Sequence, residues 1–590
     1  MSDRYYREEY SYLVEEGLEF ARRHPELARQ LNIADARGRD PNVERLLEGF
    51  AFLSSRIRQR LDDDFPELVE SLLDLIWPHH GRSIPSFCLV EFHPAAGKLT
   101  QAVEIPAGAE LESEPVGQGA RCRYRTCAPV WLPPVTLDRV QAEALGSASR
   151  LSLHFSLPPG AQAASLAGRP LRIQLFGELA NCHQVYDLLL GMKGQLRHLH
   201  KVHFQAHHAG GSLSYLRGPE VVQAAGFLPE ESLLPLGEPS FRGFNLLMEY
   251  FLFPDKFLAF YLQGLTPLAG LQGLTGFQVD FVFNRQWPVN LRLSERELRL
   301  GCVPAANLFA SDGEPIRLDQ MRSSYKVQVD TQNPEMYQVF SVDRVEGVGH
   351  QDGRRRLYQP FMTARNRLAG PAEGLEGPYY LLSRKLSPWG GLDIYLSIMD
   401  PAGKGSLPQE ETLSLSLTCS NGSLGSEPLP GQINQAIAGV PEGVVPRNLM
   451  QPIAPVFPRP GARSLWSWLS HASLNYLDLA SAERLRLLLN LFALRQDEAN
   501  LRRIEGIRSA KLKRTREMIG GSLVTGNLLA LVLEEDHFSG PGDVQLFCRV
   551  LSAFLETYAS INSFIRLVVA LAPSGQRLYL ERSHGLAGGL

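Results

Sequence analysis

Residues 40–78, DPNVERLLEGFAFLSSRIRQRLDDDFPELVESLLDLIWP, contain the clearest periodic pattern in the chain. Asp40-Pro41 is typical of a helix start, because the Asp side chain accepts from free backbone amides and proline needs no partner there. Apolar side chains then recur every three or four residues, which places them on one helix face. They are Val43, Leu46, Leu47, Phe50, Leu53, Ile57 and Leu61, followed after Pro66 by Leu68, Leu72, Leu75 and Ile76.

The apolar surface of this segment is wider than one helix pair can cover. Phe52 adds a large apolar side chain away from the main stripe, whereas Arg45, Glu48, Arg56 and Arg60 fall elsewhere on the helix. A helix that is apolar on more than one side needs more than one neighbour. The pattern alone favours an ordinary hairpin on its own domain's core, and a helix bundle shared with other chains stays open.

After this helical segment the apolar period changes to two, beginning at Ile84. Residues 151–157, 171–175 and 413–417 alternate apolar and polar side chains, as half-buried strands do. Short strands separated by Gly and Pro predict sandwich-like or barrel-like sheets. We therefore expect an α+β multidomain protein with an N-terminal helical segment, two β-rich regions and a C-terminal α+β domain. The expected boundaries are 1–85, 86–240, 241–420, a linker or arm at 421–463 that is rich in Gly, Pro and Asn, and 464–590.

The composition limits the classes of function. A chain of 590 residues with a net charge of −4 allows about three or four domains and gives no reason to expect nucleic acid or anionic lipid as a partner. Seven scattered cysteines without a C-x-x-C pair suit a reducing compartment, and the charged N-terminus predicts no secretory signal. Glycines and a proline interrupt the uncharged run between Lys256 and Asp280, which favours strand and loop over a membrane span.

A search for catalytic motifs finds none. The phosphate-binding G-x-x-x-x-G-K-[ST] loop, H-E-x-x-H and G-x-S-x-G are absent. Gly347-Val348-Gly349 is half a dinucleotide fingerprint, but Asp352 stands where the third glycine belongs. The adjacent carboxylates of Glu230-Glu231 and Glu410-Glu411 are interpreted as solvated surface, because sequence cannot show two carboxylates facing each other across a cleft. We therefore expect no catalytic residue and no cofactor.

Two clusters leave alternatives open. His198, His200, His203, His207 and His208 have a spacing that could bind zinc or copper, yet no Asp, Glu or Cys lies among them, so an exposed loop is favoured over a metal site. The basic run of Arg508, Lys511, Lys513, Arg514 and Arg516 lacks aromatic residues for base stacking. A solvated surface is the favoured interpretation of this run, and contact with an acidic protein partner is the alternative.

Several short segments carry a more specific signal. They are 40–53, Phe65-Pro66 and Trp77-Pro78-His79 near the start; Leu233-Leu234-Pro235, 243–257, Asn307-Leu308-Phe309, 314–318 and 337–342 in the middle; and 470–476 and 558–564 near the end. In this order they resemble the TssF (ImpG/VasA) family of baseplate subunits from bacterial type VI secretion systems. The resemblance covers nearly the whole chain. It departs at Asn245 and Met248, where an Arg and a Gln are more usual, and in the histidine run.

The resemblance implies a structural role without catalysis. TssF-like proteins pair as two copies with one TssG, and this wedge joins TssK trimers. Six wedges surround the VgrG spike and hold TssE, which nucleates the sheath. Such a protein would be cytoplasmic and docked at the inner membrane through the baseplate–membrane complex, without inserting into the bilayer. Helices from both TssF copies and TssG form a bundle in such wedges, and we assign 40–77 to it as a hypothesis.

Two other classes stay open on the residues alone. One is a β-rich carbohydrate-active enzyme with its cleft between the two β regions, and the other is a carbohydrate-binding protein or adhesin. The block at 243–257 also has a structural interpretation, which we favour: its Phe and Leu side chains form the core of the second β region. If two identical copies occupy different positions, the chain needs a flexible joint, and the segment 420–463 is the candidate.

Overall fold

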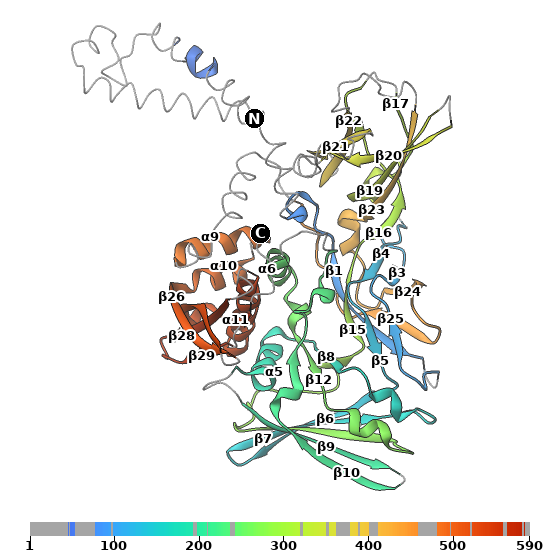
Figure 1. The fold of residues 1–590 in the computed structure, drawn as a ribbon. Helices are drawn as coiled ribbons and strands as arrows, with labels where there is room; N and C mark the ends of the chain where they lie inside the picture. Colours follow the sequence, from blue (N-terminus) through green and yellow to red (C-terminus); the bar gives the residue numbers. More distant parts are fainter. Residues whose placement is uncertain are drawn as a thin grey trace, which may run out of the picture. The chain divides into compact units, whose positions relative to one another are not determined.

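The structure is a computed structural model of residues 1–590 (Figure 1). The chain divides into two compact units, Met1–Leu75 with Arg459–Ala472, and Ile76–Pro458 with Ser473–Leu590. The structure describes residues 45, 48–53, 77–95, 98–117, 119–192, 198–208, 210–235, 242–318, 322–349, 353–361, 378–387, 390–399, 411–457, 481–495, 497–519, 522–557, 563–580 and 583–584. The described residues of the first unit are helical, and all strands described below belong to the second.

A six-stranded sheet of the second unit joins the most distant parts of the sequence. In spatial order its strands are β24 (Ile433–Ala438), β3 (Glu110–Ser113), β4 (Arg123–Thr126), β15 (Cys302–Ala306), β1 (Phe87–Pro94) and β25 (Val444–Asn448). In the antiparallel ladders Val90 of β1 lies opposite Val303 on one side and Asn448 on the other. The two-stranded sheet of β2 (Val103–Ile105) and β5 (Val130–Leu132) adds Ile105 to the same hydrophobic core.

The expected linker at 421–463 contains two strands of this sheet, and its residues 458–463 lie outside the described residues. Residues 433–448 form β24 and β25, because apolar side chains such as Ile433 bury in the core beside β1 and β3. The expected regions 86–240 and 241–420 also share sheets, since β15 pairs with β1. Alternation identifies a strand, but it does not say which distant strand provides the ladder partner, so sequence order misplaced these boundaries.

Two further sheets contain the alternating segments that the sequence predicts. One has the order β10 (Gly211–Arg217), β9 (Leu199–His208), β13 (Gly276–Phe283), β7 (Ala148–Ser156) and β6 (Thr136–Leu145). The other has the order β11 (Val222–Ala224), β12 (Ala259–Leu262), β8 (Leu171–Leu175) and β14 (Leu298–Leu300). The uncharged run 257–279 contains β12, a short 3-10 helix and the start of β13, and no helix among the described residues is long and apolar enough to cross a bilayer.

An eight-stranded sheet has its own core. Its strands are β16 (Phe309–Asp312), β23 (Glu411–Ser420), β19 (Gln338–Gly349), β20 (Arg355–Pro360), β21 (Tyr379–Leu386), β22 (Leu392–Met399) and β18 (Tyr325–Lys326), with β17 (Ile316–Leu318) also pairing with β23. Leu413, Leu415 and Leu417 point into this core, while the serines between them face outward. The predicted period of two is confirmed here.

The C-terminal part combines a sheet with helices, as expected. The sheet runs β26 (Ile507–Ile519), β27 (Ser522–Glu534), β28 (Phe564–Ala572) and β29 (Arg577–Tyr579), and β30 (Ser583–His584) also pairs with β28. Its helices are α9 (Ala482–Phe492), α10 (Glu498–Glu505) and α11 (Pro541–Glu556). The expected α+β fold class, mostly strands with few helices, is confirmed.

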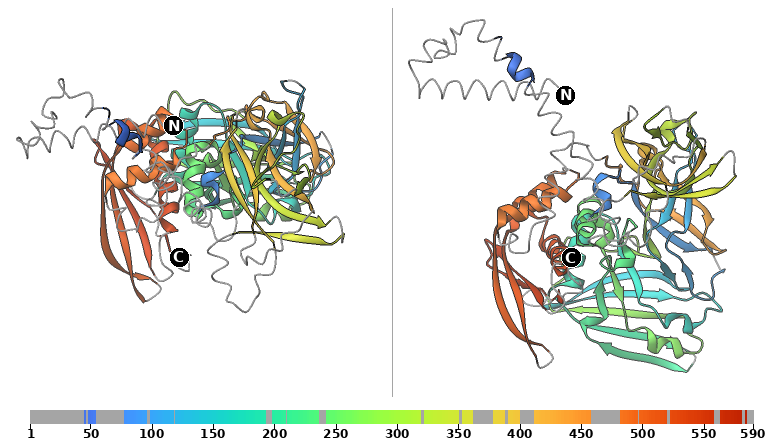
Figure 2. Two further views of the ribbon diagram at one scale, coloured as in Figure 1. Left: turned by 90° about the horizontal axis from the view of Figure 1, so that it is seen from above. Right: turned by 45° about the horizontal axis from the view of Figure 1, so that its top comes forward.

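Helix α11 lies between the C-terminal sheet and two helices from the middle of the chain. It packs on β28 with one face and on α5 (Leu179–Leu190) and α6 (Arg242–Leu252) with the other (Figure 2). The described residues also form short 3-10 helices: η1 (Pro78–Gly81), η2 (Ala163–Leu166), η3 (Pro219–Val221), η4 (Pro229–Glu231), η5 (Pro254–Phe257), η6 (Thr266–Gly270), η7 (Pro334–Met336), η8 (Gly422–Ser426) and η10 (Glu535–His537).

The contact between α11 and α5 leads to a stability prediction. A Cβ atom on Gly542 would overlap the backbone oxygen of His183 and lie 2.6 Å from its carbonyl carbon. Gly542→Ala must therefore push the two helices apart, and we expect it to lower the free energy of unfolding by about 1–3 kcal/mol. Gly270→Ala is the control, because nothing lies within 4 Å of its Cβ position. Equal thermal melting temperatures for the two variants would contradict this packing.

Candidate functional site

The predicted interface in the N-terminal helices is described at only two of its ten residues. Phe50 and Leu53 are 63% and 61% exposed, and Phe52 between them is 50% exposed. Ala51 on the same short helix is buried. The described part of this helix therefore carries three large apolar side chains that are at least half exposed. The other eight, Val43, Leu46, Leu47, Ile57, Leu61, Leu68, Leu72 and Ile76, lie outside the described residues.

Trp77, at the end of the predicted helical segment, is anchored in the core of the second unit. Its indole Nε1 donates to Asn245 Oδ1 at 2.7 Å, and its ring meets Phe492 and Phe244 edge-on at centroid distances of 5.3 and 6.4 Å. Phe244 and Asn245 lie on α6 and Phe492 on α9. Asn245, one of the two departures from the usual family pattern, therefore has a defined role as the acceptor for this tryptophan.

The block at 243–257 is buried in a core, as the structural interpretation predicts. This core also includes helices of the C-terminal part and is not that of the second β region alone. Phe244, Leu247, Phe251, Phe253 and Phe257 are all at most 3% exposed. Helix α6 packs on α9 and α11 of the C-terminal part, so the block does not belong to the second β region alone. Hydrophobicity predicts burial but does not reveal which neighbour covers each face.

Charged residues are buried beneath α6. Lys256 donates to the Glu249 carboxylate, which also accepts from Ser232 Oγ at 2.7 Å and from the backbone amide of Leu233 at 2.8 Å. Lys256 and Glu249 are 2% and 1% exposed. These contacts join two of the segments that resemble the family, 233–235 and 243–257. A buried ion pair is tolerated when hydrogen bonds satisfy its remaining atoms.

A second buried pair lies between the helices of the C-terminal part. Arg503 Nε on α10 lies 2.9 Å from Asp543 Oδ1 at the start of α11, and Arg503 Nη1 donates to Asn500 Oδ1 at 3.0 Å. Asn500 in turn donates to the backbone oxygen of Phe251 at 2.9 Å. Burial lowers the pKa of the neighbouring His183, whose Nε2 lies 3.9 Å from Asp543. The chain of contacts fastens α10 and α11 to α6.

Sequence reasoning missed these buried charges, and two of the carboxylates that it assigned to solvated surface are also buried. Glu231 accepts from the amides of Gly226 and Leu228 at 2.9 and 3.0 Å. Glu411 is fully buried and accepts from Arg356 and from Tyr358 Oη. One feature of the sequence indicates such buried pairs: a single charged residue within an apolar block, as at Glu249. If the block is buried, the charge is buried with it and needs a partner.

The half fingerprint around Gly347 is explained by this packing. A Cβ at Gly347 would overlap the Glu411 carboxylate and lie 2.6 Å from the Tyr358 ring. The glycine therefore makes room for buried side chains on the neighbouring strands β23 and β20. A dinucleotide site requires such a glycine in the turn before a helix. Gly347 lies instead within strand β19.

The histidine run forms a strand and not the exposed loop that was favoured. Residues 199–208 are β9, because Val202, Phe204 and Ala206 alternate into the core. His198 just before the strand is buried, with its Nε2 3.5 Å from Asp187 Oδ2. The described residues contain no group of three His, Cys, Asp or Glu side chains arranged to hold a metal ion.

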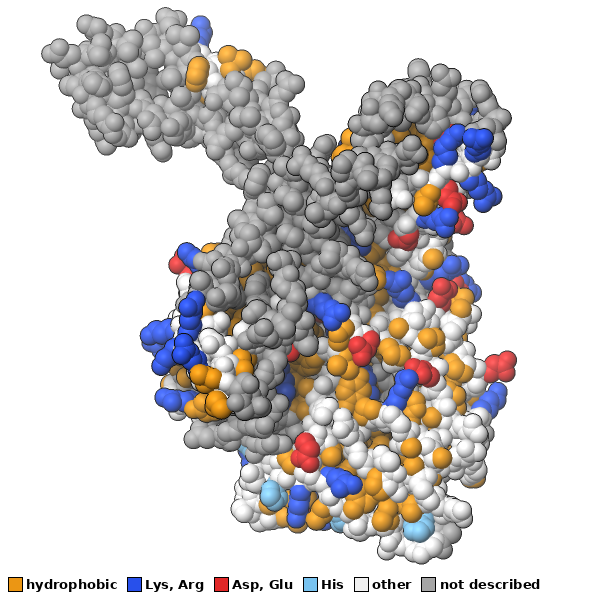
Figure 3. Space-filling view, viewed as in Figure 1, with side chains coloured by type: hydrophobic (Ala, Val, Ile, Leu, Met, Phe, Trp, Pro, Cys, Tyr) orange, Lys and Arg blue, Asp and Glu red, His pale blue; other side chains and the backbone are white. Residues whose placement is uncertain are grey.

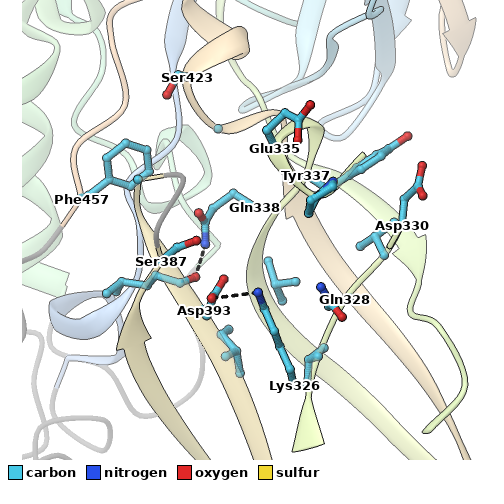
Figure 4. A pocket seen from close by; sticks show the side chains of 18 residues that line it. Lys326, Gln328, Asp330, Glu335, Tyr337, Gln338, Ser387, Asp393, Ser423 and Phe457 are labelled. Carbon is cyan, nitrogen blue, oxygen red and sulfur yellow. Dashed lines mark hydrogen bonds and ion pairs between the residues drawn. The ribbon is translucent and has the colours of Figure 1, made fainter. Parts of the chain in front are cut away.

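A small pocket lies at the base of the eight-stranded sheet (Figure 4). Its volume is about 50 Å³, well below the ~300 Å³ or more of a typical small-molecule site. Lys326 Nζ on its floor is paired with Asp393 Oδ2 at 2.8 Å, and Gln338 donates to the backbone oxygen of Leu392. The carboxylate of Asp330 accepts from Asn333 and Gln332, which lowers its pKa.

The described pocket is small, and most of the cysteines are buried. A general base needs a raised carboxyl pKa or a free imidazole beside the reacting group. In the pocket, Asp393 is paired with Lys326, and the hydrogen bonds of Asp330 lower the pKa of its carboxyl group. Burial raises the pKa of Cys122, Cys127 and Cys182 to about 12, so these thiols stay protonated and unreactive at neutral pH. What the described surface does offer is exposed apolar and basic side chains, which are suited to protein contacts.

Comparison with known proteins agrees with this description. A family model described as "Type VI secretion system, TssF" matches residues 2–585. The chain is 29% identical over 638 aligned residues to type VI secretion system component TssF1 of Pseudomonas aeruginosa strain PAO1, with 98% of both chains covered.

Two solved structures are similar over nearly their whole length. A chain from the cryo-electron microscopy structure of a TssK-TssF-TssG baseplate subcomplex matches with a TM-score of 0.76 and 30% identity, covering 92% of this chain and 99% of that one. A chain from a type VI secretion system baseplate complex matches with a TM-score of 0.60 and 27% identity, covering 99% of both.

The buried pair between α10 and α11 can be tested by substitution. Arg503→Met leaves the Asp543 carboxylate buried without its cation, so we expect the free energy of unfolding to fall by about 3–5 kcal/mol. Arg169→Met is the matched control, because Arg169 and Glu104 form an ion pair at 2.6 Å with both side chains nearly half exposed. The control should change stability by less than about 1 kcal/mol. If denaturant unfolding gave similar losses of unfolding free energy for both variants, the buried pair would be no more important for stability than the exposed one.

The titration of His79 predicts how stability depends on pH. Burial, with a smaller effect of Arg82, lowers the pKa of His79 to about 3. Between pH 3 and the unfolded value of about 6.5, the unfolded chain binds a proton that the folded chain does not. Stability should therefore fall on acidification through this window, by up to about 1.4 kcal/mol per pH unit for this group.

In the variant His79→Asn, the free energy of unfolding should depend less steeply on pH when unfolding curves are recorded between pH 6.5 and about pH 3. Phe340→Leu serves as the control, because the Phe340 ring contacts His79 at a centroid distance of 6.0 Å but does not titrate. It should lower stability without changing the slope. An unchanged slope in His79→Asn would show that this histidine does not contribute to the acid sensitivity.

Proposed function

Because this chain belongs to the TssF family of type VI secretion system proteins, we propose that it is a structural subunit of the baseplate that acts through protein contacts alone. The observation that carries the proposal is the likeness to a chain of the TssK-TssF-TssG subcomplex, which extends over 99% of that chain. A likeness over nearly the whole length of that chain supports the same kind of role for this one.

The proposed partners follow from the same relationship. Two copies of the chain pair with one TssG-type chain, and this wedge binds TssK-type subunits. Further contacts reach TssE, the sheath and the VgrG spike. The assembly lies in the cytoplasm and docks at the inner membrane. A non-catalytic role is supported by the small volume of the described pocket, about 50 Å³, and by the protonated thiol of the buried Cys122, neither of which suits an active site.

The N-terminal helices are the proposed site of contact with the TssG-type chain and the second copy. The support is the exposure of Phe50 and Leu53 together with the apolar repeat that continues through residues 43–76. Burying each Leu or Phe side chain contributes about 1.5–3 kcal/mol, so a few of them are enough to hold a bundle together. Residues 77–95 follow directly and are fixed in the second unit, so the proposed bundle is attached to a folded body.

A triple substitution tests this site. Leu47→Glu, Phe50→Glu and Leu53→Glu together place three charges in the proposed bundle, and we expect them to abolish co-purification of the TssG-type chain after co-expression. The matched control is Arg45→Glu with Arg56→Glu, which adds negative charge away from the apolar stripe. Circular dichroism melting of the second unit should be unchanged in both. Normal co-purification of a folded triple variant would refute the assignment.

The stoichiometry has a separate test. Native mass measurement of the complex formed with the co-expressed wedge genes should give two copies of this chain for each TssG-type chain. A one-to-one complex would contradict the two-copy arrangement and leave the baseplate role intact. A chain that stays monomeric beside all the co-expressed partners would contradict both.

A further inference from the structure

Strand β26 is the edge of the C-terminal sheet. It spans Ile507–Ile519 and pairs with β27 along its whole length, while its other side has no ladder partner among the described residues. An edge strand presents unpaired amide and carbonyl groups in a row, which can pair with an added strand. With thirteen residues, β26 is among the longest strands described in the protein.

The exposed side chains of this strand are strongly basic. Arg508, Lys511, Lys513, Arg514 and Arg516 are all exposed, whereas the chain as a whole has a net charge of −4. Figure 3 shows Lys and Arg side chains gathered on the side of the molecule where Figure 1 labels β26. The strand therefore concentrates positive charge on an otherwise slightly acidic protein.

These charges are available for a partner. Among the described residues, Lys511, Lys513, Arg514 and Arg516 form no ion pair, and Arg508 reaches Glu534 only at 3.9 Å with both side chains well exposed. The one acidic residue of the strand, Glu517, forms an ion pair with Arg566 of β28, with Arg566 Nη1 2.8 Å from Glu517 Oε1. The pair leaves the basic residues of β26 without an acidic neighbour on their own strand.

The basic side chains point to both faces of the sheet. Lys511 and Lys513 project to one face, and Arg514 and Arg516 to the other, because neighbouring side chains alternate along a strand. A strand added beside β26 would place its Cβ atoms about 5 Å from those of these basic residues on both faces. Acidic residues along such a segment would meet a cation whichever way they point.

We propose that β26 binds an extended acidic segment of a partner protein, which adds to the sheet as a further strand. The backbone ladder supplies affinity, and the cations on both faces select for Asp and Glu. This inference goes beyond the baseplate role and uses a different part of the chain from the N-terminal helices. It can therefore fail without affecting the proposed function, and the reverse is also true.

Binding is tested with the isolated full-length chain and fluorescent 11-residue peptides. The probe repeats Glu-Glu-Thr, which places Glu on both faces of an added strand. The controls replace each Glu by Lys or place two prolines within the acidic sequence, since proline cannot form the ladder. We expect the acidic probe to bind with an affinity that falls as salt is added, and both controls to bind at least about tenfold more weakly. Equal or absent binding of the acidic probe overturns the proposal.

Charge-reversal variants place the binding on the strand. Lys511→Glu with Lys513→Glu should weaken the acidic probe by about tenfold or more, because two attractive contacts become repulsive. The matched control is Lys201→Glu with Arg355→Glu, two exposed basic residues on β9 and β20. The control should change the affinity by less than about twofold. If both variants lost affinity for the acidic probe to a similar degree, binding would depend on the net charge of the protein and not on β26. That result would overturn the proposal.

Hydrogen–deuterium exchange distinguishes an added strand from a diffuse charge contact. Amides of 507–519 should exchange rapidly on the unpaired side and become protected when the acidic peptide binds, with no change in the other sheets. Protection already complete without peptide would show that the edge is covered, and binding without protection would show a charge contact only. Equal binding of single-stranded DNA or phosphatidylserine vesicles, with the same dependence on Lys511 and Lys513, would indicate a general anion surface. Each of these three results overturns the proposal.

Discussion

The burial of helix α6 and the turn that follows it is the constraint on which the second unit depends. Phe244 meets Trp77 and Phe492, while Phe253 packs against Phe87 of β1. This single block therefore touches the end of the N-terminal segment, the central sheet and the C-terminal helices. An apolar block with neighbours on every side cannot move without opening several cores at once, because protein interiors are densely packed.

Buried charges within this core favour one arrangement of the helices over others. The buried pair of Lys256 and Glu249 and the pair of Arg503 and Asp543 satisfy one another and the backbone groups around them. Such pairs contribute little net stability compared with apolar residues, but an unpaired buried charge is very costly. Alternative packings of α6, α10 and α11 that separate these partners are therefore strongly disfavoured.

This rigid interior suits a protein whose activity is assembly. The exposed Phe50 and Leu53 and the open edge of β26 have contrasting chemistry, apolar in one case and basic in the other. They lie in different compact units of the chain. A subunit that must contact several partners benefits from separate surfaces that do not compete for one ligand, since each can then select its partner by its own chemistry.

The sequence by itself determined the element types of its strongly periodic segments, the α+β class, the burial of 243–257 and, through the order of short segments, the family. These properties depend on local periodicity and composition, which a single chain displays directly. Only the tertiary structure decided that β24 and β25 complete the sheet of β1, that His203 lies within a strand, and that Glu411 is buried beside Gly347. Strand β1 pairs with strands more than two hundred positions away, and the buried partners Arg503 and Asp543 are 40 positions apart. No local pattern specifies which of many similar strands or charges will meet.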